Sequence, residues 1–76
     1  MNYEKTGSLI KQLRTEKKLT QKQLAERLGV SDKAVSKWER GESIPDVTVL
    51  KAIADLFGVT LDYLLKGIPE EAGTPA

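Results

Sequence analysis

The sequence contains no cysteine and no histidine among its 76 residues. Disulfide frameworks, Cys/His zinc sites, cysteine nucleophiles and histidine-based acid–base chemistry are therefore excluded. Aromatic residues make up only 5% of the chain, and no apolar run approaches the roughly 18 residues that a membrane span needs. The N-terminal stretch MNYEKTGSLI lacks the apolar region of a signal peptide, and no phosphate-binding glycine loop or metal-ligand cluster occurs. These absences predict a soluble, cytoplasmic domain that binds no metal, no cofactor and no membrane.

Charge is present in both signs, but it is distributed unevenly along the chain. The whole sequence has a net charge of +1, yet residues 11–40 carry nine Lys or Arg against four acidic residues, whereas residues 41–76 carry two Lys against six acidic residues. Solvated charge has no reason to segregate in this way unless one part of the molecule meets a charged partner. The pattern favours a polyanion on a basic face, and ordinary solvated helix faces are the alternative interpretation.

Apolar residues recur at spacings of three and four along most of the chain, which predicts an all-α fold. Turn signals divide the sequence into five helices, which we expect at about residues 3–17, 21–28, 32–40, 47–57 and 60–66. Thr20 and Gln23 have the spacing of a capping box at the second helix, and Gly29 stands where a helix ends in a left-handed residue. Residues 1–66 are therefore predicted to form one compact five-helix domain. Residues 67–76 are rich in Gly, Pro and Glu without periodicity, and are predicted to be a linker or tail.

The apolar residues on the inner faces of these helices form the expected core. They are Leu9, Ile10, Leu13, Leu24, Ala25, Leu28, Val35, Trp38, Val47, Leu50, Ile53, Ala54, Phe57, Leu61, Leu64 and Leu65. A tryptophan also suggests base stacking or wedge intercalation, but the spacing of three residues between Val35 and Trp38 favours the core.

The connection between the second and third helices is only the tripeptide GVS, too short to lay the helices antiparallel, so it predicts a steep helix-turn-helix crossing. The segment LTQKQLAERLGVSDKAVSKWERG resembles the helix-turn-helix of the phage repressor and Cro type, the XRE family of bacterial regulators, and the resemblance extends over about residues 6–65. The matching positions are the glutamine that opens the first helix, the small residue inside it, the turn glycine and five apolar residues: Gln21, Ala25, Gly29, Leu24, Leu28, Val30, Val35 and Trp38.

This resemblance implies a lambda repressor-like DNA-binding fold, in which the third helix (residues 32–40) lies in the major groove of double-stranded DNA. Similar proteins are transcriptional regulators, more commonly repressors than activators. One helix reads only about four to six base pairs, so such proteins usually bind as homodimers on inverted-repeat operators. The resemblance also implies an ion pair between Arg14 and Glu39, which spacing alone does not indicate, and which is either partly buried or exposed.

The polar face of the third helix supplies the expected DNA contacts. Base edges are assigned to Asp32, Lys33, Ser36 and Lys37, and phosphates to Gln21, Lys22, Ser31 and Arg40. Lysine can donate to guanine O6 or N7 and serine to either kind of base, while the positive end of a helix favours phosphate. Asp32 has two interpretations, because it suits the helix dipole as a structural residue and can also accept from cytosine N4.

Two other functions could use some of the same residues. Ser36 with Lys33 or Lys37 could form a catalytic dyad, but nothing predicts the concave, desolvated pocket that this chemistry needs, so we expect no enzyme activity. The alternative function is a helical protein-interaction domain with a solvated basic face. A dimer surface is expected on the last helix and the residues after it, at Tyr63, Leu64, Leu65 and Ile68, although these residues could instead close the core.

Overall fold

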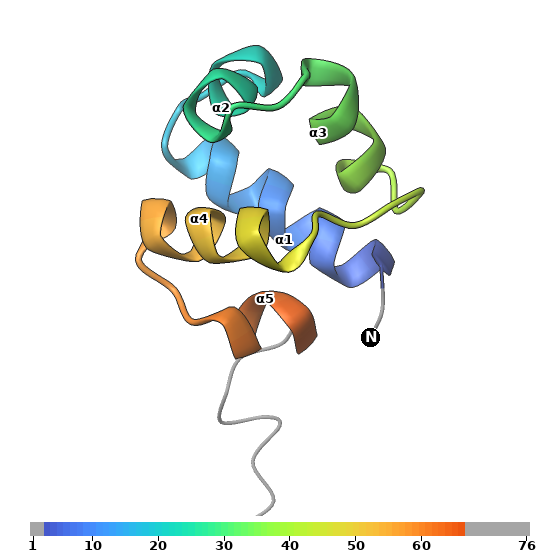
Figure 1. Cartoon of the computed structure of the whole chain (residues 1–76), viewed down its shortest axis with the longest axis vertical. Helices are drawn as coiled ribbons and strands as arrows, with labels where there is room; N and C mark the ends of the chain where they lie inside the picture. The colour runs from blue at the N-terminus through green and yellow to red at the C-terminus, as the bar shows by residue number, and fades with distance from the viewer. Residues whose placement is uncertain (1–2, 67–76) are drawn as a thin grey trace, which may run out of the picture.

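The computed structural model describes residues 3–66, which form five α-helices joined by short turns (Figure 1). They are α1 (Tyr3–Glu16), α2 (Gln21–Leu28), α3 (Asp32–Glu39), α4 (Val47–Phe57) and α5 (Leu61–Lys66). The predicted all-α, five-helix fold is therefore confirmed, with α1 and α3 each ending one residue earlier than expected and α5 beginning one residue later. The predicted tail lies outside the described residues. None of the described helices is long and apolar enough to cross a membrane.

Local side-chain chemistry sets the helix boundaries around the turn between α2 and α3. The Thr20 hydroxyl accepts a hydrogen bond from the Gln23 amide at 3.0 Å, and the Gln23 side chain accepts from the Thr20 amide at 2.8 Å, which completes the predicted capping box. Gly29 ends α2 with a φ of 73°, a left-handed conformation that only glycine adopts without steric cost. The Ser31 hydroxyl then accepts from the Ala34 amide at 3.1 Å and opens α3.

The helices are arranged so that α2 and α3 form one end of the molecule and α5 the other (Figure 1). α1 packs against both α3 and α5, while α2 packs against α3 and α4. α1 therefore connects the helix-turn-helix end to the opposite end of the domain, and its contact with α3 helps to set the position of that helix.

The core lies where these inner faces meet, and it matches most of the expected residues. The buried apolar residues are Leu9, Ile10, Leu24, Ala25, Val35, Trp38, Leu50, Ile53, Ala54, Phe57 and Leu64, with Leu13, Leu28, Leu61 and Leu65 packed against them. Val47 was expected in the core, but this prediction is wrong because the side chain is 64% exposed. Val47 has the same helical spacing as the buried residues of α4. It is the first residue of the helix, however, about one turn before Leu50, which is the first residue of α4 to be buried.

Two small residues of α1 hold the neighbouring helices close. A Cβ atom at Gly7 would lie 1.9 Å from the backbone oxygen of Trp38, so only glycine permits the observed approach of α1 to α3. Next to it, the buried Thr6 hydroxyl donates to the Leu64 carbonyl at 2.8 Å and joins α1 to α5. Both contacts link residues far apart in the chain, and the sequence analysis did not predict them.

Candidate nucleic-acid interface

α3 has two faces with opposite exposure. Val35 is fully buried and Trp38 is 5% exposed, so this side of the helix is fixed in the core and Trp38 is not available to stack on a base. On the other side Lys33 and Lys37 are exposed, and Ser36 between them is half-buried. Asp32, in the first turn of the helix, is also exposed. The four residues expected at base edges are thus on the accessible part of α3.

The turn holds α2 and α3 together through the backbone as well as through packing. The amides of Gly29 and Val30 both donate to the Ala25 carbonyl, the second at 3.0 Å. Ala25 itself is 2% exposed, and its short side chain suits the place where two helices cross closely. Ala25 and Gly29 therefore fix the relative placement of the two helices.

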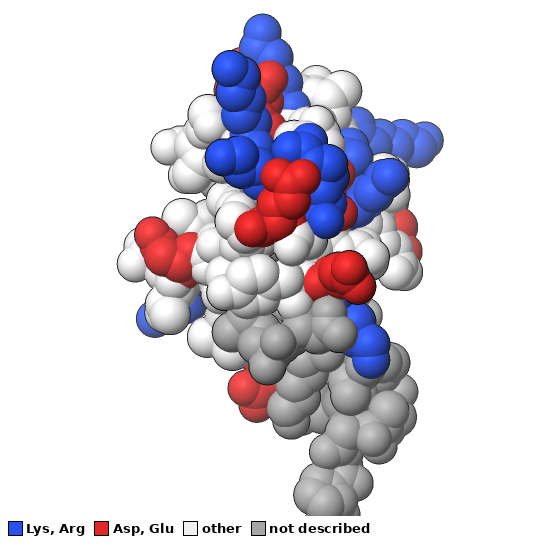
Figure 2. Space-filling model, turned by 90° about the vertical axis from the view of Figure 1, so that its right-hand side faces the viewer, with Lys and Arg blue, Asp and Glu red and all other residues white. Residues whose placement is uncertain are grey.

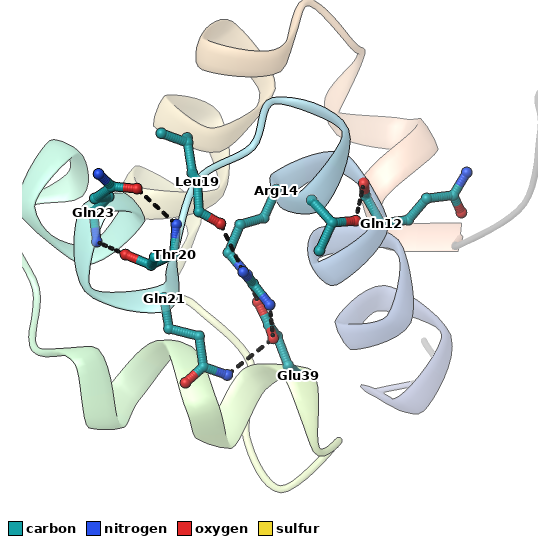
Figure 3. Close-up of polar contacts among 8 residues, drawn as sticks. Gln12, Arg14, Leu19, Thr20, Gln21, Gln23 and Glu39 are labelled. Carbon is teal, nitrogen blue, oxygen red and sulfur yellow. Dashed lines mark hydrogen bonds and ion pairs between the residues drawn. The ribbon is translucent and has the colours of Figure 1, made fainter.

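A polar network joins α1, the start of α2 and the end of α3 (Figure 3). Arg14 Nε lies 2.7 Å from Glu39 Oε2, and Arg14 Nη2 donates to Glu39 Oε1 at 3.1 Å, which gives a bidentate pair. The third guanidinium nitrogen, Nη1, donates to the Leu19 carbonyl at 2.7 Å. The side chains of Arg14 and Glu39 are 11% and 4% exposed, so the pair is of the partly buried kind.

Gln21 also belongs to this network. Its Nε2 donates to Glu39 Oε1 at 3.0 Å, so one amide hydrogen of a residue expected at phosphate is already directed toward the protein. A primary amide has two such hydrogens, so Nε2 has one further hydrogen that can be donated. Sequence spacing gave no sign of the contact, because Gln21 and Glu39 are 18 positions apart. Lys22 and Ser31, two other residues expected at phosphate, are exposed.

The end of α3 carries a second ion pair, which the sequence analysis missed. Arg40 Nε donates to Glu42 Oε2 at 2.7 Å and Arg40 Nη2 donates to Glu42 Oε1 at 3.2 Å, while Arg40 Nη1 donates to the Ser36 hydroxyl. The hydrogen bond and the charge of Glu42 raise the pKa of Arg40, and those of Arg40 lower the pKa of Glu42. The only sequence signal was an acidic residue two positions after the arginine, across Gly41.

Basic side chains gather over the end of the molecule that α2 and α3 form. Figure 2 shows Lys and Arg grouped on the upper part of one face, with acidic side chains among and below them. The basic residues of α2, α3 and the residue that follows are Lys22, Arg27, Lys33, Lys37 and Arg40.

In the described part of the chain, no cluster of three acidic residues could hold a metal ion.

The residues expected at a dimer surface differ in how far they are buried. Leu64 is fully buried, so of its two interpretations the dimer surface is wrong and closing the core is confirmed: its carbonyl accepts from Thr6 of α1. Tyr63 and Leu65 are half-buried and pack against the core. Ile68 lies outside the described residues.

A family model described as "Helix-turn-helix" matches residues 10–64, which includes all of α2, α3 and α4. The chain belongs to the XRE family of helix-turn-helix domains. Members of this family are DNA-binding domains of transcriptional regulators and are not enzymes. The XRE resemblance inferred from residues 6–65 is thereby confirmed.

Several known proteins share this XRE domain. The transcriptional activator BcrR of Enterococcus faecalis is 55% identical over 58 residues, which cover 76% of this chain and 28% of BcrR. The repressor protein C2 of Salmonella phage P22 is 39% identical over 67 residues, covering 88% of this chain and 31% of C2. The chain spans between 28% and 56% of the length of the curated relatives BcrR, YqaE and YonR.

Solved structures agree with this placement. The crystal structure of the P22 c2 repressor in complex with a synthetic operator has a TM-score of 0.78 and 38% identity, covering 83% of this chain and 96% of that chain. The structure of Bacillus thuringiensis PlcR, in complex with a peptide and DNA, has a TM-score of 0.76 and 34% identity, covering 86% of this chain and 23% of PlcR.

Proposed function

We propose that this XRE domain binds double-stranded DNA sequence-specifically, with α3 in the major groove, as the DNA-reading part of a bacterial or phage transcriptional regulator. The observation that carries the proposal is the division of α3 into two faces. Val35 and Trp38 anchor one face in the core, and Lys33 and Lys37 project from the other. The P22 c2 repressor, whose structure with an operator resembles this domain, supports the same use of the fold.

Within this proposal, the outer residues of α3 read base edges. Lys33 and Lys37 are one turn apart, and each can donate to guanine O6 or N7. Ser36 lies between them and can donate to a base through its own hydroxyl hydrogen, since its oxygen already accepts from Arg40. Asp32 either accepts from cytosine N4 or interacts with the positive end of α3.

Phosphate contacts are proposed for the residues that flank this reading surface. The first backbone amides of α2, at Gln21 and Lys22, have no carbonyl partner within the helix, and the side chains of Lys22 and Ser31 are exposed. Arg40 lies at the other end of α3. These contacts fix the register of the domain on the duplex and carry little sequence information.

We further propose that two copies bind an inverted-repeat operator and that the usual outcome is repression. One recognition helix covers about four to six base pairs, which is too short a site for a genome, whereas two half-sites one helical turn apart suffice. Repression needs only that the bound domains cover a promoter. The relatives include both an activator, BcrR, and repressors, so a reporter with the selected operator placed over or upstream of the promoter decides between the two outcomes.

The alternative, a protein-interaction domain with a solvated basic face, receives less support from the surface. Among the described residues, the large apolar side chains that are exposed are Tyr3 and Val47. Single exposed apolar residues are normal on a monomeric domain, whereas a protein-docking site needs a contiguous patch of several hundred Å². Retention on heparin that disappears with salt supports the DNA function, and salt-insensitive retention of a protein partner supports the alternative.

A substitution of Lys37 tests the proposed function most simply. Lys37→Ala is expected to cost about 1 to 3 kcal/mol on the preferred DNA site, because one base contact is lost. Lys51→Ala is the matched control, since Lys51 is an exposed lysine of α4 and the same charge is removed. Equal losses for the two variants in fluorescence-anisotropy titrations would contradict base reading by α3.

A further inference from the structure

An acidic residue stands at the end of the recognition helix, within reach of the proposed DNA contacts. Glu42 follows α3 across the turn at Gly41, and its backbone amide donates to the Lys37 carbonyl at 2.9 Å. Its carboxylate accepts from Arg40 Nε at 2.7 Å and from Arg40 Nη2 at 3.2 Å. A carboxylate is thereby fixed next to an arginine that we have assigned to phosphate.

We propose that Glu42 limits the affinity of this domain for DNA by occupying the face of Arg40 that a phosphate would bind. The inference rests on the proposed function and specifies how the phosphate contact at the end of α3 is regulated. In the free protein, Glu42 takes the place of the phosphate group. DNA must displace the carboxylate to reach the Nε–Nη2 edge of Arg40.

The geometry of Arg40 supports this competition. Carboxylates and phosphates both bind the guanidinium group through two parallel N–H donors, and Glu42 uses such a pair. The third nitrogen, Nη1, is directed to Ser36. A guanidinium group has five N–H donors, of which Glu42 takes two and Ser36 takes one. A phosphate can therefore bind the Nε–Nη2 edge of Arg40 with two parallel hydrogen bonds only by displacing Glu42.

The charge of Glu42 and the exposure of the Arg40–Glu42 pair also support competition with phosphate. The Arg40 hydrogen bond and charge lower the pKa of Glu42, so its carboxylate is ionised at neutral pH and repels a nearby phosphate. The side chains of Arg40 and Glu42 are 54% and 53% exposed. Exposed pairs contribute little to folding, so the contact can be removed while the domain remains folded.

The test compares Glu42→Gln with the wild-type chain in titrations of duplex DNA at several salt concentrations. We expect Glu42→Gln to bind about three- to tenfold more tightly at about 0.1 M salt, on preferred and random sequences alike. The log–log salt slope should stay close to that of the wild type, because Arg40 reaches the same phosphate in both chains once the carboxylate has been displaced. Glu26→Gln is the matched control, since Glu26 is an exposed glutamate of α2 and its loss changes the net charge equally.

A second comparison shows whether the effect passes through Arg40. In an Arg40→Gln background, Glu42→Gln should change the affinity no more than Glu26→Gln does, because no guanidinium remains to be released. Urea midpoints within experimental error of the wild type are expected for all these variants, which shows that they remain folded.

The outcomes separate this inference from the proposed function. If the wild type binds DNA but Glu42→Gln and Glu26→Gln give equal affinities, the competition for Arg40 is refuted and the proposed function stands. A gain that persists fully in the Arg40→Gln background also refutes it, since the effect is then general charge repulsion. If the wild type shows no salt-dependent binding to any duplex, both proposals fail.

Discussion

Substitution of Gly7 by alanine is the sharpest perturbation of the contact between α1 and α3. The added Cβ would lie 1.9 Å from the Trp38 oxygen and 3.0 Å from the Trp38 carbonyl carbon. Both are backbone atoms, so no side-chain rotation relieves the overlap. The Trp38 oxygen also accepts from the Gly41 amide at 3.0 Å, so a shift of this carbonyl disturbs the end of α3 as well.

Two opposing effects set the magnitude. Alanine is favoured over glycine inside a helix by about 1 kcal/mol, and overpacking of a close contact costs about 1 to 3 kcal/mol. The oxygen must move by roughly 1 Å or more to reach even 3.0 Å from the new atom, which places the overpacking cost at the top of that range. We therefore expect Gly7→Ala to lower the free energy of unfolding by about 2 kcal/mol, instead of raising it.

Urea unfolding followed by tryptophan fluorescence measures this directly, because Trp38 is the single tryptophan of the chain and lies beside the contact. Ser8→Ala is the control, since Ser8 is exposed on the same helix and should be unchanged or slightly stabilised. DNA affinity should fall for Gly7→Ala under conditions where the variant is folded, because α3 is displaced. A Gly7→Ala variant as stable as the wild type would refute the close approach.

Other substitutions test three separate contacts. Trp38→Ala should cost about 3 to 5 kcal/mol in chemical unfolding followed by circular dichroism, and a loss below about 1 kcal/mol would place Trp38 at the surface. Arg14→Met should cost about 3 kcal/mol because Glu39 stays buried without its cation. In a double-mutant cycle, the double reversal Arg14→Glu with Glu39→Arg should recover part of the stability that each single reversal loses. Recovery should be incomplete, because the Leu19 carbonyl then faces a carboxylate instead of the guanidinium. No recovery would argue against the ion pair. Thr6→Val should cost about 1 to 2 kcal/mol in thermal melts by removing the buried bond to Leu64, and Thr6→Ser should keep most of the stability; equal losses would exclude the hydrogen bond as the cause.

The helices were predictable from the sequence because their signals are local. The capping box of Thr20 and Gln23 and the left-handed Gly29 fix both ends of α2 through neighbouring residues, and both ends were located correctly. Val47 shows where local periodicity fails. The apolar spacing of α4 continues through its first residue, but burial depends on whether another element covers that turn.

The candidate site was predictable only in part, because some of its contacts are set by helical geometry and others by how the chain folds. The outer stripe of α3 follows from helical geometry, which places Lys33 and Lys37 opposite the buried residues. The pairing of Arg14 with Glu39 spans 25 positions and was expected only from the resemblance to the XRE family. The involvement of Gln21 in that pair and the close approach at Gly7 depend on tertiary geometry, which composition and spacing do not encode. The contact between Arg40 and Glu42 is local, but it forms across the turn at Gly41 and follows no regular helical spacing.

Selection of bound sequences from a random duplex library tests the central claim, that the outer face of α3 reads bases. The wild type should select a sequence with inverted symmetry, and Lys33→Ala and Lys37→Ala should each lose preference at a different base position within the half-site. A variant that loses only a phosphate contact, by comparison, should keep the same selected sequence and lower the log–log salt slope by about 0.9. If Lys33→Ala and Lys37→Ala both behave in this second way, α3 does not read bases and the assignment of its outer face is wrong.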